Sequence, residues 1–341
     1  MVKIVVVPID KAERIRSSLL EKGLLDLERK IKAKENDGTN VTTFLEIPVT
    51  SEVEGMETLE QPEPEYYRKQ MSLRERIEDE LQDYYSGPIP PGWQIIGKII
   101  VVSIDESSNP IKELIARKLL EIYPQCNTVV RDMGVEGQFR KPKREIIIGT
   151  QTETINKENN CLFKLDVTKV MFSKGNLYEK KLMSNIGSDE LIIDMFAGIG
   201  YFSIPIAVHA KPKKIYSIEL NPESYTYLKE NIRLNQVEDI IEALNGDCAL
   251  ITPKAVADRV LMGYVGTTHH YLKQAIQALK PSGGMLHYHE TTPEQLLFER
   301  PIDRIKDVAM KEGKKVEIRE CRKVKKYSPG VWHIVVDAWI Y

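Results

Sequence analysis

A short apolar segment that runs into a glycine turn constrains this sequence more than any other feature. Residues 191–193 are Leu-Ile-Ile, Asp194 follows them, and Gly198 and Gly200 precede the largely apolar segment 202–208. This order predicts a buried strand, a tight turn and the beginning of a helix. Glycines let the backbone approach a ligand, and a helix N-terminus offers free N–H groups. A Gly-x-Gly pair also occurs in ordinary turns, so it identifies no ligand by itself.

Acidic residues follow the next two predicted strands as well. Residues 215–218 lead to Glu219, and residues 240–244 lead to Asp247. In βαβ nucleotide sites a carboxylate about 20 residues after the first strand holds ribose hydroxyls, and ligands bind at the carboxyl ends of the strands. Together with Asp194 these residues make three strand-end acids, which suit a nucleoside and would repel a pyrophosphate. The third glycine of the dinucleotide-binding pattern is also missing. The pattern therefore predicts S-adenosylmethionine rather than NAD. The alternative is an ordinary turn followed by strand-end acids.

The composition limits the class of protein. The 341 residues suffice for two or three domains, and 42% hydrophobic with 29% charged residues is typical of soluble globular proteins. No apolar segment approaches the roughly 20 residues that a membrane span requires, and the N-terminus is strand-like rather than a signal peptide. Four cysteines without a Cys-x-x-Cys pair indicate reduced thiols and no metal site. We expect a cytoplasmic monomer whose nucleic-acid surface, at a net charge of −2, is a local patch.

The chain divides into four parts. Residues 1–50 predict a small α/β domain, and the acidic, apolar-poor residues 51–71 predict a linker. Residues 72–186 predict a middle α+β domain. Residues 187–341 alternate strand and helix, which predicts a Rossmann-like, doubly wound α/β sheet. In the first and third parts we expect strands at 2–7, 30–34, 42–48, 93–104, 128–130, 145–149, 161–166 and 169–172, and helices at 11–22, 72–85 and 110–122.

Two basic segments are candidates for contact with RNA. Residues 137–144 form a predicted loop that contains Phe139, Arg140, Lys141, Lys143 and Arg144. Cations beside an aromatic side chain favour an RNA contact, and a solvated surface loop is the alternative. The lysine-rich segment 314–326 is open to two interpretations. It is either an edge strand that lysines protect from aggregation or a phosphate contact.

Several segments together resemble the tRNA guanine-N1-methyltransferases and wyosine aminocarboxypropyltransferases, which form one superfamily. The resemblance covers nearly the whole chain, including the small N-terminal part. It implies a class I methyltransferase fold, S-adenosyl-L-methionine as group donor, and tRNA as partner. The segments that carry it are 159–166, 172–173, 194–200 and 327–337.

Two segments resemble the aminocarboxypropyltransferase branch. The methyltransferases of this superfamily carry a motif like Asn-Leu-Pro after the fourth strand and a motif like Ser-Pro-Arg after an aromatic residue. At these two places this chain has Met-Gly-Tyr-Val (262–265) and Ser-Lys-Gly-Asn (173–176). That branch implies transfer of the 3-amino-3-carboxypropyl group to 4-demethylwyosine, beside the anticodon of phenylalanine tRNA, with release of methylthioadenosine. The alternatives are guanine-N1 methylation at the same nucleotide, both activities in one chain, and a non-catalytic RNA-binding protein that keeps the fold.

The resemblance also implies roles for individual residues. Glu179 matches the methyltransferases' general base, with a solvated helix start as the alternative, and Arg140 matches a functional arginine. Gly263 replaces an amide side chain and is expected to open space beside the sulfonium, so that Cγ rather than the methyl meets the base. Lys174 and Asn176 are expected to hold the methionine carboxylate. Cofactor contacts are expected from Ser173, Lys174, Asn176, Lys180, Asp194, Phe196, Gly198, Gly200, Glu219, Leu220, Asp247, Cys248, Gly263 and Tyr264.

Overall fold

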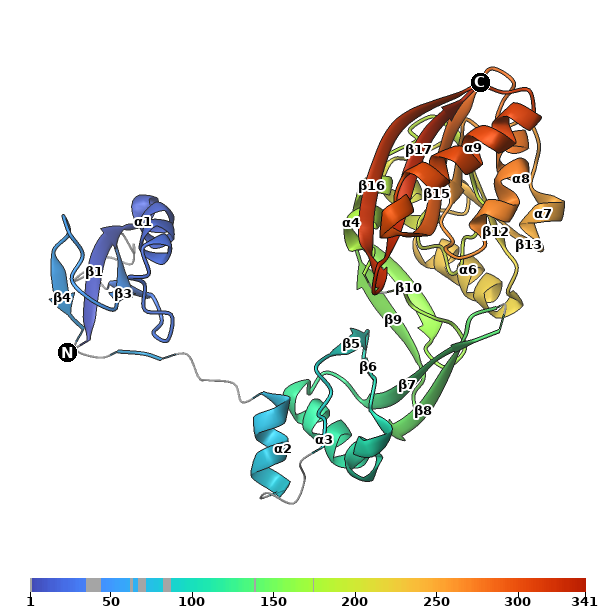
Figure 1. The fold of residues 1–341 in the computed structure, drawn as a ribbon. Coiled ribbons are helices and arrows are strands. Elements are labelled where there is room, and N and C mark those ends of the chain that lie inside the picture. The colour runs from blue at the N-terminus through green and yellow to red at the C-terminus, as the bar shows by residue number, and fades with distance from the viewer. Residues whose placement is uncertain are drawn as a thin grey trace. The chain divides into compact units, whose positions relative to one another are not determined.

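A computed structural model describes residues 2–34, 44–61, 64–66, 72–81, 87–137, 139–173 and 175–341. The chain forms two compact units, Met1–Ser72 and Leu73–Tyr341 (Figure 1). The predicted middle and cofactor domains therefore belong to one unit. A single hydrophobic cluster explains this, because it contains Val130 and Phe163 from the middle segment together with Ile192 from the large sheet.

The N-terminal unit is an antiparallel sheet of order β2-β3-β1-β4. Its core includes Val5, Leu19 and Ile47. The linker expected at 51–71 is partly wrong, because Thr58–Glu60 pairs with β1 as an edge strand. Two of its three residues are exposed, so its acidic composition hid the strand. The elements are β1 (Lys3–Pro8), α1 (Ile9–Glu21), β2 (Lys32–Lys34), β3 (Phe44–Val49) and β4 (Thr58–Glu60).

The middle segment forms a second sheet, of order β5-β6-β7-β8, against which α3 packs. The single strand expected at 93–104 is wrong, since two antiparallel strands turn at Gly97, whose φ is +56°. The helix expected at 110–122 is preceded by a 3₁₀ helix, because Asp105 accepts a hydrogen bond from Ser107 N–H at 2.9 Å. The elements are α2 (Leu73–Leu81), β5 (Trp93–Ile96), β6 (Ile99–Val102), η1 (Glu106–Ile111), α3 (Lys112–Ile122), β7 (Thr128–Glu136) and β8 (Lys141–Ile148).

A hairpin of β9 (Glu153–Glu158) and β10 (Cys161–Asp166) connects this sheet to the rest of the unit. The strand expected at 169–172 is absent from the described structure. The Asp166 carboxylate instead accepts a hydrogen bond from Thr168 N–H at 2.8 Å, which folds the chain into a turn. The sequence of β9 shows no alternation of apolar and polar residues, because none of its side chains is fully buried.

The C-terminal part is a seven-stranded sheet of order β13-β12-β11-β14-β15-β17-β16, in which β17 alone runs opposite to the other six strands. Adjacent residues Ile192 and Ile193 of β11 point into separate hydrophobic clusters, so both faces of the sheet are covered. This confirms the predicted doubly wound sheet. Its strands are β11 (Leu191–Asp194), β12 (Lys214–Glu219), β13 (Ile241–Asn245), β14 (Arg259–Met262), β15 (Gly284–Pro293), β16 (Val316–Ser328) and β17 (Val331–Ile340).

Helices connect these strands, and one of them, α6, also holds the β9–β10 hairpin. The side chains of Asn231 in α6 and of Asn235, the residue that follows the helix, each bond to both the N–H and the C=O of a β10 residue, at 2.6–3.1 Å. Asn231 binds Lys164, and Asn235 binds Leu162. They therefore replace a neighbouring strand along the edge of β10. The helices are α4 (Leu177–Met183), α5 (Ser203–His209), α6 (Pro222–Leu234), α7 (Cys248–Ile251), η2 (Thr268–Tyr271), α8 (Leu272–Ala278), η3 (Glu294–Leu296) and α9 (Glu299–Lys311).

Candidate cofactor and catalytic site

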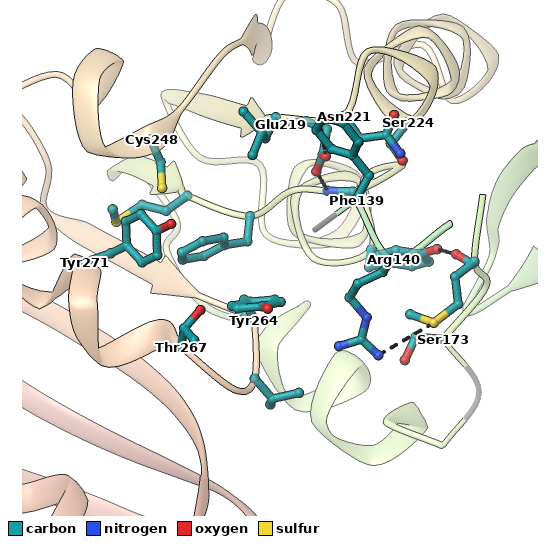
Figure 2. Close-up of a pocket in the computed structure, with 18 of the residues that line it drawn as sticks. Phe139, Arg140, Ser173, Glu219, Asn221, Ser224, Cys248, Tyr264, Thr267 and Tyr271 are labelled. Carbon is teal, nitrogen blue, oxygen red and sulfur yellow. Dashed lines mark hydrogen bonds between the residues drawn. The ribbon is translucent and has the colours of Figure 1, made fainter. Parts of the chain in front are cut away.

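A cavity of about 300 Å³ lies at the carboxyl ends of β11, β12 and β14 (Figure 2). In Figure 2, Cys248 and Tyr271 lie at one end and Arg140 points toward Ser173 at the other. Most of the predicted site residues meet here, although they come from widely separated segments. Those that line the cavity are Arg140, Ser173, Asn176, Phe196, Gly198, Glu219, Leu220, Asp247, Cys248, Gly263 and Tyr264.

Glu219 lines the cavity and also holds the glycine turn. Its carboxylate accepts hydrogen bonds from the N–H groups of Gly198 and Asn221, both at 2.7 Å. Burial raises the pKa of Glu219 above its ordinary value, and these two donors oppose that rise. Gly198 has a φ of +57°, which a glycine adopts without strain. The turn and the second-strand acid therefore form one rigid unit.

Asp194 lies behind the turn and does not line the cavity. Its carboxylate accepts hydrogen bonds from the Ser203 hydroxyl at 2.6 Å and from Phe196 N–H at 3.3 Å. Burial raises the pKa of Asp194 to about 6. Gly200 also faces the protein interior, against Ile204. These two predicted contact residues support the turn from within the fold.

The end of the cavity beyond Asp247 is apolar and aromatic. The Phe196 ring stacks on Tyr264 with centroids 5.3 Å apart, and Tyr271 meets Phe196 edge-on at the same distance. Asp247 accepts a hydrogen bond from Ala249 N–H at 2.8 Å and so caps α7. A flat aromatic base with polar edges fits such a surface.

The opposite end of the cavity carries positive charge. Arg140 enters from the turn between β7 and β8, and its Nη2 lies 3.8 Å from the sulfur of Met171. Its buried Nε finds no acceptor among the described residues, and the buried Oδ1 of Asn176 likewise finds no donor among them. Lys325 of β16 and His333 of β17, which are cross-strand neighbours, line the same end.

The predicted basic loop is shorter than expected. Of the described residues, only Gly137, Phe139 and Arg140 lie in the turn, because β8 begins at Lys141. Arg144 is a buried cation that donates to the Val167 carbonyl at 2.6 Å, so it cannot belong to a surface patch. Lys141 and Lys143 are exposed.

Glu179 and Lys180 are buried beside the cavity and do not line it. Only 1% of Glu179 is exposed, and both of its oxygens accept hydrogen bonds from Arg322, at 2.6 and 2.9 Å. Lys180 bonds to Glu158 at 2.8 Å and to the Ser173 carbonyl at 3.1 Å. The predicted general base is therefore held in an ion pair in this conformation. Lys174, also predicted, lies outside the described residues.

Arg322 connects Glu179 to a second buried acid, Asp337, with which it also forms an ion pair. Asp337 accepts a further hydrogen bond from His287 at 2.6 Å if that nitrogen carries its proton. Burial alone would raise the pKa of Asp337, but His287 and Arg322 outweigh burial and hold the pKa at about 2.

Gly263 packs against an aromatic ring, and the space expected beside the sulfonium stays a prediction. A Cβ at this position would lie 2.7 Å from Cε2 of Phe202, so the phenylalanine ring already occupies the volume that a side chain would need. Gly263 lines the cavity with its backbone. Its sequence neighbours gave no signal of this contact, because Phe202 belongs to the glycine-turn segment of another strand.

Several lining residues were missed by sequence reasoning. Tyr201, directly after the glycine turn, donates a hydrogen bond to the Met171 carbonyl, and its position next to the motif was an available signal. The basic segment 314–326 and the family-like segment 327–337 contain three more lining residues, Lys325, Tyr327 and His333. The sequence of a strand does not reveal which of its side chains faces a cavity.

Two further observations concern the described part of the chain as a whole. No helix in it is long and apolar enough to cross a membrane. Nor does it contain a group of three or more His, Cys, Asp or Glu side chains placed to hold a metal ion.

Models of three protein domains match consecutive parts of the sequence. The tRNA methyltransferase 5 N-terminal domain matches residues 5–57. The TYW2 N-terminal domain matches residues 73–152, and the TRM5/TYW2 methyltransferase domain matches residues 154–319.

Individual relatives match over nearly their whole length, and they include both aminocarboxypropyltransferases and guanine-N1-methyltransferases. A tRNA(Phe) (4-demethylwyosine(37)-C(7)) aminocarboxypropyltransferase of Methanocaldococcus jannaschii is 47% identical over 72% of this chain and 96% of its own. A tRNA (guanine(37)-N(1))-methyltransferase Trm5b of Pyrococcus abyssi is 34% identical over 97% of each chain. The crystal structure of M. jannaschii TYW2 in complex with AdoMet matches with a TM-score of 0.61 and 42% identity, over 73% of this chain and 99% of that chain.

Proposed function

Because the chain belongs to the TRM5/TYW2 methyltransferase family, we propose that it transfers the 3-amino-3-carboxypropyl group of S-adenosylmethionine to C7 of 4-demethylwyosine in phenylalanine tRNA. The observation that carries this proposal is the 47% identity to the aminocarboxypropyltransferase over 96% of its length. The middle segment supports the same branch, since residues 73–152 match the TYW2 N-terminal domain.

The cavity fits the group donor. The Glu219 carboxylate keeps acceptor capacity for ribose hydroxyls after its two backbone contacts, and Asp247 with the aromatic end suits adenine. At the other end, the orphaned Oδ1 of Asn176 and Nε of Arg140 need polar partners, which an amino-acid group would supply. When bound, S-adenosylmethionine supplies an electrophilic Cγ. C7 of the base forms a bond to Cγ, the Cγ–S bond breaks with its electron pair going to the sulfur of neutral methylthioadenosine, and C7 loses its proton.

The residues of this chain act mainly by positioning, because the leaving thioether is neutral and needs no acid. Glu219 and the glycine turn would hold the nucleoside of the bound donor. In this conformation Glu179 is held in an ion pair with Arg322. That ion pair would have to open before Glu179 could accept the proton from C7.

We assign the RNA to the side where the β7–β8 turn meets the cavity. Phe139 lines the opening and is 51% exposed, which suits stacking on a base of the anticodon loop. Exposed Lys141 and Lys143 follow on β8 and can neutralise phosphates. We further propose that the protein acts in the cytoplasm as a monomer. Its four cysteines are free thiols, and the described residues of one chain line the cavity.

The released small molecule tests the transfer directly. Incubation of the protein with S-adenosylmethionine and tRNA bearing 4-demethylwyosine is expected to yield methylthioadenosine, because attack at Cγ leaves the methyl on sulfur. Mass spectrometry of the nucleosides and of the small molecules measures this. A parallel reaction uses the same tRNA with guanosine at that position.

Guanine-N1 methylation is the second candidate, favoured by the match of residues 5–57 to the tRNA methyltransferase 5 N-terminal domain. It predicts S-adenosylhomocysteine from the guanosine tRNA. That product, with no methylthioadenosine from the tricyclic substrate, would reverse the assignment. Both products, each from its own tRNA, would identify a bifunctional enzyme.

Replacing Glu219 by alanine is expected to weaken S-adenosylmethionine binding about ten- to a hundredfold, since hydrogen bonds to a charged group contribute roughly 1.5–3 kcal/mol. The glycine turn also loses its anchor in this variant. Isothermal titration calorimetry measures the affinity, and Glu238→Ala, at an exposed acid, is the matched control. Equal affinities in the two variants would contradict the cofactor assignment.

A further inference from the structure

The transferred group replaces a hydrogen on C7, so the reaction needs an acceptor for one proton. That acceptor has to meet the base at the end of the cavity beside Ser173 and the Phe139 opening. Glu179 is buried, lies outside the cavity lining, and has both oxygens bonded to Arg322. A side chain that lines this end of the cavity is therefore better placed than Glu179 to take the proton.

His333 is such a side chain. Its neighbours Arg140 and Lys325 are cations that already carry their protons, and Tyr201 donates its hydroxyl hydrogen to the Met171 carbonyl. His333 lines the cavity, although only 2% of the residue is exposed. Burial and the neighbouring positive charge of Lys325 hold the pKa of His333 at about 3. The ring is therefore neutral near pH 7 and keeps the lone pair that a proton acceptor needs.

The hydrogen-bond partners of His333 indicate which ring nitrogen has the lone pair. Nε2 of His333 lies 3.1 Å from Nδ1 of His289, which is buried on β15. The other nitrogen of His289, Nε2, lies 4.0 Å from Oε1 of Glu179. A carboxylate favours an N–H on the side of the ring that faces it, so the hydrogen of His289 belongs on Nε2 and its Nδ1 is an acceptor. His333 then donates from Nε2, and its lone pair is on Nδ1.

We propose that His333 is the catalytic base that removes the C7 proton, and that Glu179 is a positioning residue that acts through His289. This inference rests on the proposed function, because C7 is the atom that loses the proton. Once C7 has bonded to Cγ, its C–H bond breaks, the electron pair returns to the ring of the base, and the proton goes to Nδ1 of His333. Glu179 stays ionised in its pair with Arg322. The proton passes from His333 to water after the products leave.

The charges around the two histidines suit this role. The ring that has gained Cγ carries the positive charge that the sulfonium has lost, so it gives up its proton readily and a weak base suffices. The negative charge of Glu179 favours the protonated form of His333. Lys325 on the neighbouring strand opposes that form, and Arg322 opposes protonation of His289. His333 is therefore free of its extra proton before each reaction, and Glu179 stabilises the charge that appears during it.

Replacing His333 by glutamine tests the assignment in the full-length protein. The glutamine amide can still donate to His289 from the place of Nε2, but it has no basic nitrogen. Release of methylthioadenosine in a single turnover with tRNA bearing 4-demethylwyosine is expected to slow about 10²–10⁴-fold, the usual contribution of a general base. Calorimetric affinities for S-adenosylmethionine and tRNA should not change. The matched control is His209→Gln, at an exposed position at the end of α5.

Deuterium at C7 of the tRNA base gives a measurement that a merely structural role would not change. The ratio of the protium rate to the deuterium rate should be larger in His333→Gln than in wild type, because removal of the hydrogen then limits the reaction. A slower reaction with an unchanged ratio would mean that His333 only shapes the cavity. Equal rates in His333→Gln and in the control would remove it from the reaction. If the glutamine variant loses cofactor affinity, His333→Asn takes its place in the same measurements.

A double substitution distinguishes a direct from an indirect role of Glu179. If Glu179 acts through the histidines, Glu179→Gln should slow wild type but add little to the effect of His333→Gln. Losses that multiply would make Glu179 an independent base and overturn its part in this inference. The isotope measurement on His333→Gln decides the role of His333 even if Glu179→Gln does not fold.

The failure of this inference differs from a failure of the proposed function. If wild type releases S-adenosylhomocysteine and no methylthioadenosine, the proposed transfer is wrong and the inference fails with it. If wild type releases methylthioadenosine and His333→Gln does so at the rate of the control, only the inference is wrong.

Discussion

Replacing Arg322 by methionine is expected to lower the free energy of unfolding by about 3–5 kcal/mol, the usual effect of removing one partner from a buried ion pair. Arg322 lies between Glu179 and Asp337, and its guanidinium bonds to both carboxylates. Methionine would keep much of the volume but leave two buried negative charges without their cation. Glu179 is almost wholly buried and could not recover hydration.

Chemical denaturation at neutral pH measures this change, and Arg319→Met, on the same strand with a half-exposed side chain, is the control. The control should lose no more than ~1 kcal/mol. Similar losses in the two variants would mean that the Arg322 pair contributes little.

Acid unfolding should change in the same variant. The pKa of Asp337 is held at about 2, below its unfolded value, so its contribution is present at neutral pH and is lost as pH falls toward 2. Without Arg322 only His287 holds that pKa down, so the contribution of Asp337 should be smaller and its loss should be complete at a higher pH. An acid midpoint identical to that of wild type would contradict this.

Replacing Asn231 by leucine is expected to cost several kcal/mol as well, because each buried polar group left unpaired costs about 1–3 kcal/mol. The Asn231 amide bonds to the N–H and C=O of Lys164, and its nitrogen also donates to the Ile199 carbonyl at 3.1 Å. Leucine has a similar volume and can make none of these bonds. Ile199 lies inside the glycine turn, so the variant should also bind S-adenosylmethionine more weakly.

Thermal denaturation and calorimetry with the cofactor measure the two effects. Arg233→Leu introduces the same side chain at an exposed position of α6 and should change neither. A stable Asn231→Leu protein with normal cofactor affinity would show that the β9–β10 hairpin is held by its apolar contacts alone.

The sequence predicted the centre of the site because its signals there are local. The strand, turn and helix around Gly198 follow from a few adjacent residues, and Glu219 follows from the fixed length of a βαβ unit. Asp194 shows the limit of that reasoning. A strand-end acid is visible in the sequence, but whether it faces the ligand or turns inward to Ser203 depends on the packing of the following helix.

The contacts that the sequence could not predict join distant residues. Arg322 and Glu179 are 143 positions apart, and each taken alone resembles a surface charge. The Phe202 ring that occupies the space beside Gly263 likewise comes from another strand–helix unit. Strand β4 was hidden because an edge strand buries too few side chains to show an apolar pattern.

The backbone of Arg140 reveals a compromise between the stability of the fold and the charge at the cavity. Its φ is +51°, in the left-handed region where a residue with a Cβ loses about 1–2 kcal/mol relative to glycine. The turn would be at least as stable with glycine, which suits such turns better. The protein therefore keeps a less favourable residue at the tip of a hairpin, and the guanidinium beside Met171 is what it gains. Stability of the turn gives no reason for an arginine here, whereas the role proposed for Arg140 at the cavity does.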